Sequence, residues 1–281
     1  MYVCQPYFHI LLKILSEGDS CTDRTGTGRS TITGISAQYD LREGFPILQE
    51  RAIFFKRNVL PELAWMLSGQ TKVSQLKKHG SKCNIWDPWD NPQDDLGPIY
   101  GKQWRVSGEL GLVDQIRQAI HLIETEPTSR RIMVDSWSPS ELHQMAIPPC
   151  HFAFQLHPFK ESGFMDLTLY QRSADMFLGV PYNMAFYALL LEGLCKLTGY
   201  KARFLNHHIG DAHIYDNHFD QVAELMKRNH ILKVDKNHRK VTLSSDCDLH
   251  SLDDFIFSLS EKEWNLEDYS PMKHIKAEVA V

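Results

Sequence analysis

The chain has little cysteine, and none of it occurs in the paired spacing of a disulfide framework. The 281 residues include six cysteines, scattered singly as Cys4, Cys21, Cys83, Cys150, Cys195 and Cys247. The sequence also lacks an apolar leader followed by a small-residue cleavage site. We therefore expect free thiols in a reducing cytoplasm.

Long apolar runs and an excess of positive charge are missing too. The most apolar stretch, residues 184–197, is too short to span a bilayer and contains Glu192 and Lys196, so we expect a buried core helix and no membrane association. The formal net charge is -5, which does not attract a polyanion such as nucleic acid. Any bound phosphate must therefore be held by a local cluster of arginines.

Linkers, repeats and a glycine-rich phosphate loop are also absent. No Gly/Ser/Pro-rich stretch or fixed-period repeat divides the chain, so we predict a single domain over residues 1–281. The segment Arg24-Thr25-Gly26-Thr27-Gly28 is too short for a phosphate loop and is not followed by a helix pattern. Dinucleotide and ATP sites are therefore not expected.

The chain does contain an irregular mixture of helix and strand patterns. Apolar residues recur at helical spacing in residues 7–17, 60–67, 112–123 and 219–226. Short segments rich in β-formers occupy residues 131–137, 151–157 and 165–170. Because the two patterns do not alternate regularly, we predict an α+β fold with one mixed sheet covered by helices.

One cysteine stands where a nucleophile is plausible. Cys150 follows Pro148 and Pro149 and precedes the strand expected from His151, so its backbone is fixed at a strand entrance. A lone cytosolic cysteine is more often a buried structural residue. A nucleophilic thiol, with an ordinary pKa of about 8.5, needs nearby positive charge that favours the thiolate.

Three arginines are candidates for that charge. Arg130 and Arg131 lie some twenty positions upstream of Cys150, and Arg172 follows another predicted strand. Guanidinium groups around a thiolate would also bind a phosphate through charge-assisted hydrogen bonds. Each arginine taken singly is more often a solvated surface residue, so the hypothesis requires that they converge.

Two further clusters suggest binding of a flat ring and a sugar. Trp86 and Trp89 flank carboxylates and suit a flat heterocycle, although tryptophans are more often core residues. His213 and Tyr215 lie on one side of an extended segment, where both can bond a sugar hydroxyl. A metal is the competing interpretation, but the spacing matches no zinc pattern, so none is expected; the histidines concerned are His207, His208, His213 and His218.

Taken in order, these segments resemble the folate-dependent thymidylate synthases from about residue 23 to the end of the chain. The resemblance is carried by Asp23-Arg24-Thr25-Gly26-Thr27-Gly28, Glu62-Leu63 before Trp65, Trp86-Asp87, Leu96-Gly97-Pro98-Ile99-Tyr100-Gly101-Lys102-Gln103-Trp104-Arg105, Ser129-Arg130-Arg131, Pro149-Cys150-His151, Tyr170-Gln171-Arg172-Ser173, Asp175, Leu178-Gly179, Asn183, and residues 210–215 and 275–281. It implies a thymidylate synthase-like fold in a homodimer joined sheet to sheet.

The resemblance implies a catalytic role for six residues. Cys150 would add to C6 of dUMP, so that C5 becomes a nucleophile toward the one-carbon unit of 5,10-methylenetetrahydrofolate, the co-substrate. Glu62 would organise water for the proton transfers, helped by Tyr100 and His151. Asn183, which reads the uracil O4/N3 edge, and Asp175, which meets the pterin, complete the set.

The resemblance also implies how both substrates are held. The 5′-phosphate would be bound by Arg24, Arg172 and Ser173, and by Arg130 and Arg131 donated across the interface of an obligate homodimer. His213 and Tyr215 would bind the ribose 3′-hydroxyl, and Gln171 and Asn183 complete the nucleotide site. The folate site would comprise Trp86, Trp89, Asp175, Gly179 and the carboxylate of Val281, which closes the site as a lid.

The substrate and product remain to be chosen. Asn183 favours dUMP over dCMP, because an amide both donates and accepts, whereas relatives acting on cytosine nucleotides carry Asp there. The predicted product is dTMP, made by hydride reduction. The alternative is a phage-type dUMP hydroxymethylase acting in a host cytoplasm, and a remote one is an inactive RNA-binding or scaffold relative. Departures from the family pattern raise the alternative; they are Gln49-Glu50-Arg51, Ser138, Phe186 and one extra residue before Glu62.

Overall fold

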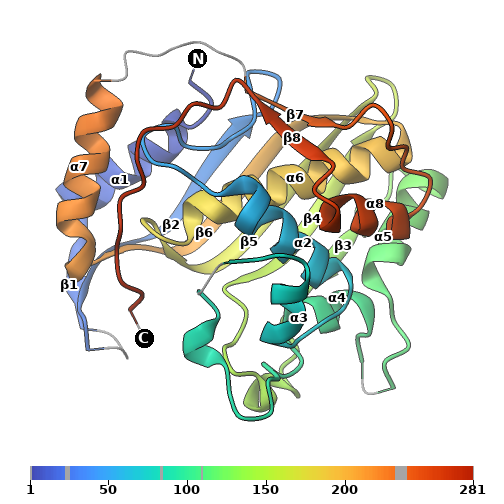
Figure 1. Cartoon of the computed structure of the whole chain (residues 1–281), viewed down its shortest axis with the longest axis horizontal. Coiled ribbons are helices and arrows are strands. Elements are labelled where there is room, and N and C mark those ends of the chain that lie inside the picture. Colours follow the sequence, from blue (N-terminus) through green and yellow to red (C-terminus); the bar gives the residue numbers. More distant parts are fainter. Residues whose placement is uncertain (1, 23–25, 83–84, 109, 232–238, 281) are drawn as a thin grey trace.

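The structure, a computed structural model, describes residues 2–22, 26–82, 85–108, 110–231 and 239–280. In chain order the helices are α1 (Gln5–Glu17), α2 (Leu60–Leu67), α3 (Val73–Lys78), α4 (Tyr100–Arg105), α5 (Gln115–Thr125), α6 (Val180–Thr198), α7 (Phe219–Ile231) and α8 (Leu252–Ser260). The strands are β1 (Asp19–Cys21), β2 (Arg29–Asp40), β3 (Met133–Asp135), β4 (His151–Phe159), β5 (Phe164–Asp175), β6 (Lys201–Tyr215), β7 (Lys240–Leu243) and β8 (Trp264–Glu267). Figure 1 shows their arrangement.

A six-stranded sheet in the order β1-β2-β6-β5-β4-β3 forms the centre of the molecule. Only β5 and β6 pair in parallel within it, and α6 is the crossover between them. A separate two-stranded sheet pairs β7 with β8. The predicted α+β fold, a single domain with a mixed sheet and helices, is confirmed.

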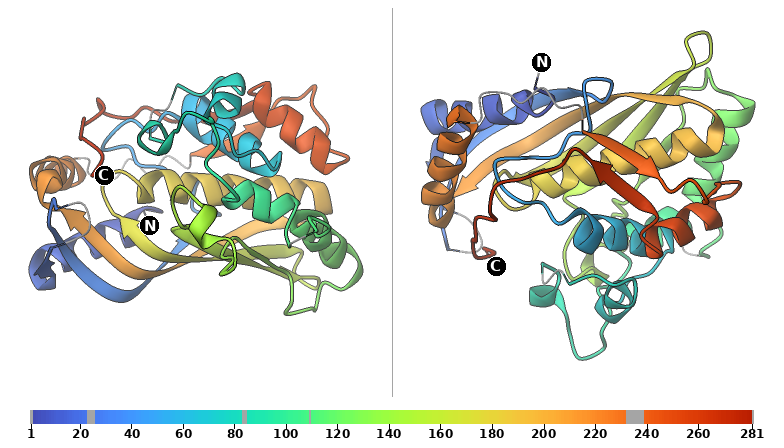
Figure 2. Two further views of the ribbon diagram at one scale, coloured as in Figure 1. Left: turned by 90° about the horizontal axis from the view of Figure 1, so that it is seen from below. Right: turned by 45° about the horizontal axis from the view of Figure 1, so that its top comes forward.

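The two faces of the central sheet differ. Along β2 the buried residues Ala37 and Tyr39 alternate with the exposed residues Ser36 and Gln38, as the two-residue period of a strand requires. The buried face packs against α6, whose segment 180–195 is almost wholly buried, whereas the other face presents polar side chains. In Figure 2, α6 and α2 lie on one side of the sheet. The opposite face is therefore open in a single chain.

Local sequence explains most helix boundaries. Pro61 lies at the start of α2, and α1 ends where Gly18 leaves the helical conformation. The helix predicted from residue 112 instead begins at Gln115, because Asp114 caps it by accepting a hydrogen bond from the Arg117 N–H. The boundary predicted for that helix was therefore wrong by three residues, and Leu112 is 79% exposed in the preceding loop.

The segment before Glu62, where one extra residue was expected, contains an unusual helical turn. Residues Phe55–Val59 form a π-helix that leads directly into α2. A π-helical turn is how a helix accommodates one added residue without changing the faces of the turns that follow. Glu62 lies in the first turn of α2, directly after this π-helix.

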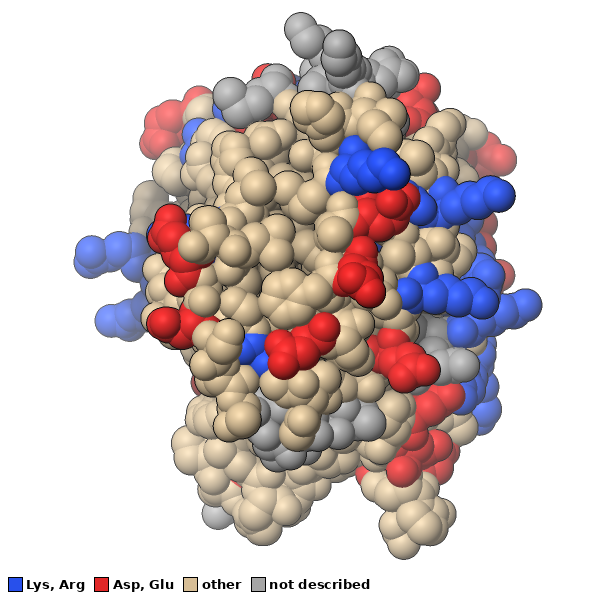
Figure 3. Space-filling view, turned by 90° about the vertical axis from the view of Figure 1, so that its left-hand side faces the viewer, with Lys and Arg blue, Asp and Glu red and all other residues tan. Residues whose placement is uncertain are grey.

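The surface shows neither a membrane helix nor, on the side drawn in Figure 3, one continuous basic patch. Within the parts of the chain that the structure describes, no helix is long and apolar enough to cross a membrane. Figure 3 shows the side of the molecule that carries α1 and α7 in Figure 1, where lysines and arginines are interspersed with carboxylates on a largely uncharged surface.

Candidate active site

Cys150 lies at the entrance of β4, where the predicted fixed backbone is found. Its carbonyl accepts a hydrogen bond from the Arg172 N–H on β5 at 2.8 Å. The Arg172 guanidinium donates to the carbonyls of Pro149 at 2.9 Å and Pro148 at 2.7 Å, and its Nη2 is 3.8 Å from Cys150 Sγ. The predicted pairing of a partly exposed thiol with a positive charge is therefore present.

Tyr100 and His151 border the same cysteine. The Cys150 N–H donates to the Tyr100 hydroxyl at 2.8 Å, and the Tyr100 ring stacks on His151 with centroids 4.3 Å apart. Burial raises the pKa of Tyr100, as does the nearby Cys150, so the phenol stays protonated. Burial lowers the pKa of His151 to about 3, so this imidazole is neutral beside its partner, the Tyr187 hydroxyl.

Glu62 is paired with Trp86 across the site. The Trp86 indole N–H donates to Glu62 Oε1 at 2.7 Å. Trp86 also contacts Tyr100 and Trp89, with ring centroids 5.9 Å and 6.3 Å away. Burial raises the pKa of Glu62 to about 7, although the Trp86 hydrogen bond opposes the rise. Glu62 is thus poised to exchange a proton near neutral pH.

A chain of hydrogen bonds orients Asn183 at the start of α6. Gln171 Nε2 donates to Asn183 Oδ1 at 3.2 Å and to the Ser173 carbonyl at 3.0 Å. The Gln171 Oε1 atom is 2.9 Å from His207 Nε2, and burial lowers the pKa of His207 to about 3. A neutral His207 that donates from Nε2 therefore fixes the Gln171 amide, which leaves the Asn183 amide nitrogen to donate elsewhere.

The predicted sugar-binding pair lies together at the end of β6. The His213 and Tyr215 rings meet edge to face with centroids 4.9 Å apart. His213 Nδ1 is 2.8 Å from Asp211, which also accepts hydrogen bonds from Arg29 at 3.0 Å and Thr31 at 2.9 Å. These supports, Asp211, Arg29 and Thr31, were not predicted from the sequence, although Asp211 lies within the motif 210–215.

Asp175, at the end of β5, is an ionised acceptor next to Gly179 and Asn183. Its Oδ1 accepts from the Leu178 N–H at 3.0 Å and lies 3.8 Å from His218 Nδ1. Burial alone would raise the pKa of Asp175, but the nearby His218 imidazole holds it below the ordinary value. A Cβ added at Gly179 would meet the Asp175 carbonyl at 3.3 Å and Asn183 Oδ1 at 3.7 Å.

The Gln49-Glu50-Arg51 stretch is largely buried, and its backbone binds the C-terminal segment. The Met272 N–H donates to the Gln49 carbonyl at 2.7 Å, and Glu50 accepts a hydrogen bond from Tyr2 at 2.8 Å. Arg51 is fully buried over the Phe177 ring, and none of its guanidinium nitrogens has a hydrogen-bond partner among the described residues. This stretch therefore supports the core and the C-terminal segment.

The remaining predicted residues are placed less completely. Arg130 and Arg131 are exposed in the turn before β3, an edge strand of the sheet, so their predicted contact with a phosphate on a second subunit stays a prediction. Arg24 and Val281 lie outside the described residues. His218 donates to the Glu278 carbonyl at 2.7 Å, which ties the segment leading to residue 281 to the site.

The site thus combines a thiol beside a guanidinium, a carboxyl group with a pKa near neutrality, and an oriented amide. The family model described as Thymidylate synthase matches residues 5–281, which includes every element that contributes a residue to this site.

Proposed function

From the premise that this chain belongs to the thymidylate synthase family, and is a C5 methyl or hydroxymethyl transferase acting on dUMP, we propose that its product is dTMP. The choice of dTMP rests on the anchored C-terminal segment, which supports the exclusion of water. The covalent step that both candidate products share rests on the position of Cys150. Its Sγ faces the Arg172 guanidinium at 3.8 Å while its backbone N–H is held by Tyr100 at 2.8 Å.

The proposed first step is attack of the Cys150 thiolate on C6 of the uracil ring. As the Sγ–C6 bond forms, the C5=C6 electron pair moves toward O4, and C5 becomes nucleophilic. Asn183 supports this step because its free amide N–H can donate to O4 as negative charge develops there. Loss of the sulfur at the end of the reaction restores the C5=C6 bond.

The proton that leaves C5 requires a base near the ring. Glu62 is the candidate, acting directly or through an ordered water, because its pKa of about 7 lets it accept and return a proton at physiological pH. Trp86 holds the carboxyl group in place through its indole N–H. The neutral His151 and protonated Tyr100 supply hydrogen bonds without adding charge.

The residues predicted for the folate site fit the co-substrate. Methylenetetrahydrofolate supplies the one-carbon unit and, in a synthase, the hydride. The Trp86 and Trp89 rings offer flat apolar surface for a pterin, and the ionised Asp175 offers an acceptor for its N–H groups. The proposed hydride step needs water to be shut out, which the buried Trp86 side chain and the anchored C-terminal segment support.

We propose further that the active form is a homodimer joined through the open sheet face. That face carries paired polar and aromatic side chains, including Ser36 with His208 at 2.7 Å and Gln38 with Asn206 at 2.7 Å. A C2 interface there is self-complementary, and the exposed Arg130 and Arg131 at the sheet edge would reach the phosphate of the other subunit.

A second candidate product is 5-hydroxymethyl-dUMP. Phe186 is buried with its ring centroid 6.1 Å from His151 and 6.2 Å from Trp104, where relatives often carry Ser. A bulky apolar ring in the layer behind His151 removes a polar group from the proton-transfer side of the pocket. Such a change can redirect the last step toward capture by water.

One assay separates these products. The protein is incubated with dUMP and methylenetetrahydrofolate while dihydrofolate absorbance is followed. The mass of the nucleotide product is then measured by mass spectrometry. Dihydrofolate with dTMP supports the synthase, and 5-hydroxymethyl-dUMP without dihydrofolate supports the hydroxymethylase. Cys150→Ser should abolish turnover and Cys247→Ser should not, since Cys247 is a free thiol that precedes α8; absence of turnover in the wild type would overturn the proposal.

A further inference from the structure

Glu62 and Tyr100 are carried by two helices whose backbones touch. A Cβ added at Gly101 in α4 would lie 2.5 Å from the Met66 carbonyl oxygen and 2.9 Å from the Met66 Cα in α2. Only glycine permits this approach. The relative position of α2 and α4 therefore sets where Glu62 and Tyr100 stand beside Cys150.

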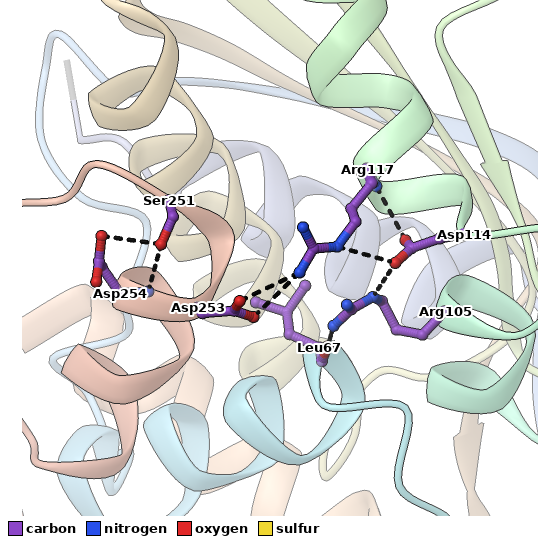
Figure 4. Close-up of polar contacts among 7 residues, drawn as sticks. All are labelled: Leu67, Arg105, Asp114, Arg117, Ser251, Asp253 and Asp254. Carbon is purple, nitrogen blue, oxygen red and sulfur yellow. Dashed lines mark hydrogen bonds and ion pairs between the residues drawn. The ribbon is translucent and has the colours of Figure 1, made fainter.

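Arg105 ties the far ends of the same two helices together. It is the last residue of α4, and its Nη1 donates to the carbonyl of Leu67, the last residue of α2. Its Nε donates to Asp114 Oδ2 at 2.9 Å. Figure 4 shows the guanidinium between these two acceptors. The Arg105 side chain is 14% exposed and that of Asp114 is 24%, so the pair is partly shielded from solvent.

Arg117 forms a second set of ion pairs nearby, and these are more exposed to solvent than the Arg105–Asp114 pair. Arg117 lies between Asp114, at 3.4 Å, and Asp253 on α8, at 3.2 Å (Figure 4). Its side chain is 56% exposed and that of Asp253 is 73%. Exposed pairs of this kind contribute little, because water screens them and both side chains lose entropy. The inner bonds of Arg105 are therefore the ones that hold the helices.

We propose that Arg105 is a positioning residue of the reaction: by binding the end of α2 and the cap of α5, it holds Glu62 and Tyr100 in register at Cys150. This inference rests on the proposed function, and it gives a role to the end of the motif 96–105. Without Arg105 the C-terminal end of α2 loses its side-chain hydrogen bond to α4. A shift of about 1 Å at a reacting group lowers a rate on the order of a hundredfold.

The test compares four variants of the full-length protein. Arg105→Ala removes both bonds, Arg105→Lys keeps a charge but not the fork that reaches two acceptors, and Asp114→Asn keeps the helix cap while removing the ion pair. Asp253→Asn is the matched control, because it breaks the exposed pair alone. The measured quantities are kcat, KM for dUMP, thermal unfolding, and the midpoint of the Glu62 carboxyl band in pH-difference infrared spectra, assigned with Glu62→Gln.

We expect Arg105→Ala to lower kcat by about 10- to 100-fold, with KM for dUMP changed less than about threefold. The midpoint of the Glu62 band should move to lower pH, because a displaced carboxyl group is better hydrated. Arg105→Lys and Asp114→Asn should fall between Arg105→Ala and the wild type, and Asp253→Asn should match the wild type in both measurements.

The proposal is overturned if Arg105→Ala keeps the wild-type kcat. It is also overturned if kcat falls only in proportion to the folded fraction while the Glu62 midpoint stays in place. If Arg105→Ala does not fold, Asp114→Asn and Arg105→Lys decide in the same way. A wild-type protein that is inactive on dUMP would refute the proposed function. The infrared midpoint of Glu62 does not require turnover, so it would still test whether Arg105 positions Glu62.

Discussion

The backbone N–H of Cys150 donates to the Tyr100 hydroxyl at 2.8 Å, across fifty residues of chain. The bond joins the entrance of β4 to the first residue of α4, so it places a helix residue directly against Cys150. The same phenol ring stacks on His151 and contacts Trp86. Tyr100 therefore links Cys150 to Glu62, because its ring contacts Trp86 and the Trp86 indole N–H donates to the Glu62 carboxyl group.

Tyr100→Phe should reduce both stability and the rate of thiol addition. The variant leaves the Cys150 N–H without an acceptor, which destabilises the fold by about 1–3 kcal/mol. Urea unfolding measures the loss of stability, and release of tritium from C5 of labelled dUMP measures the combined rate of the steps from thiol addition to loss of the C5 proton. Tyr269→Phe is the matched control, because the Tyr269 hydroxyl also accepts from a backbone N–H, but from that of Ile53, at 2.8 Å, and not from that of Cys150. A similar loss of rate in the control would argue against a special role for Tyr100.

Glu62 should make the fold sensitive to pH. Its pKa rises from an ordinary 4.5 to about 7 in the folded state, so its contribution to stability is complete below about pH 4.5 and is lost as the pH rises through 7. A rise of this size corresponds to at most about 3 kcal/mol. Between pH 5 and pH 8, wild type should lose stability relative to Glu62→Gln in urea unfolding, with exposed Glu124→Gln as control. Equal pH slopes for wild type and Glu62→Gln would contradict the raised pKa.

Asn183→Asp should shift the substrate from dUMP toward dCMP. A carboxylate accepts from the N4 amino group of cytosine but cannot donate to O4 of uracil. Gln171 already donates to Asn183 Oδ1, so the aspartate keeps this support and should stay in place. Steady-state kinetics with both nucleotides measure the ratio of kcat/KM values, and Asn265→Asp, on β8, serves as control. An unchanged ratio would mean that Asn183 does not read the pyrimidine edge.

Two inactive variants should complement each other if the arginines cross the interface. One subunit carries Cys150→Ser, and the other carries Arg130→Ala with Arg131→Ala. In a reassociated equal mixture, half the dimers are mixed and each holds one intact site, so about a quarter of the wild-type activity should return. Recovery measured after unfolding and refolding together, against each variant refolded alone, checks this. No recovery despite mixed dimers would place both arginines at their own subunit's site or outside the site.

The sequence predicted the placement of Cys150 at a strand entrance beside an arginine. Pro148 and Pro149 restrict the backbone before Cys150, and the strands expected on either side place Arg172 against it. The helix α2 was predicted without error at either end, since Pro61 and the apolar spacing mark it. The proline positions and the apolar spacing that support these predictions are local features of the sequence.

Other features depend on long-range packing that no local pattern reveals. The Glu62–Trp86 hydrogen bond closes across a loop, and the Arg29–Asp211 pair joins strands far apart in sequence. The strand β2 was not predicted, because its polar and apolar residues alternate only weakly before Ala37. The burial of Arg51, an always charged side chain, runs against the usual preference for surface arginine and was not foreseen either.

The most direct test of the account is to trap the bond between Cys150 and the nucleotide. In 5-fluoro-dUMP, fluorine replaces the C5 hydrogen that a base must remove as a proton, so with methylenetetrahydrofolate the adduct should persist. Peptide mass spectrometry should then find the nucleotide and the folate on the peptide containing Cys150, and nothing on Cys150→Ser. A wild-type protein that makes product but carries the adduct on another residue, or turnover by Cys150→Ser, would contradict the account.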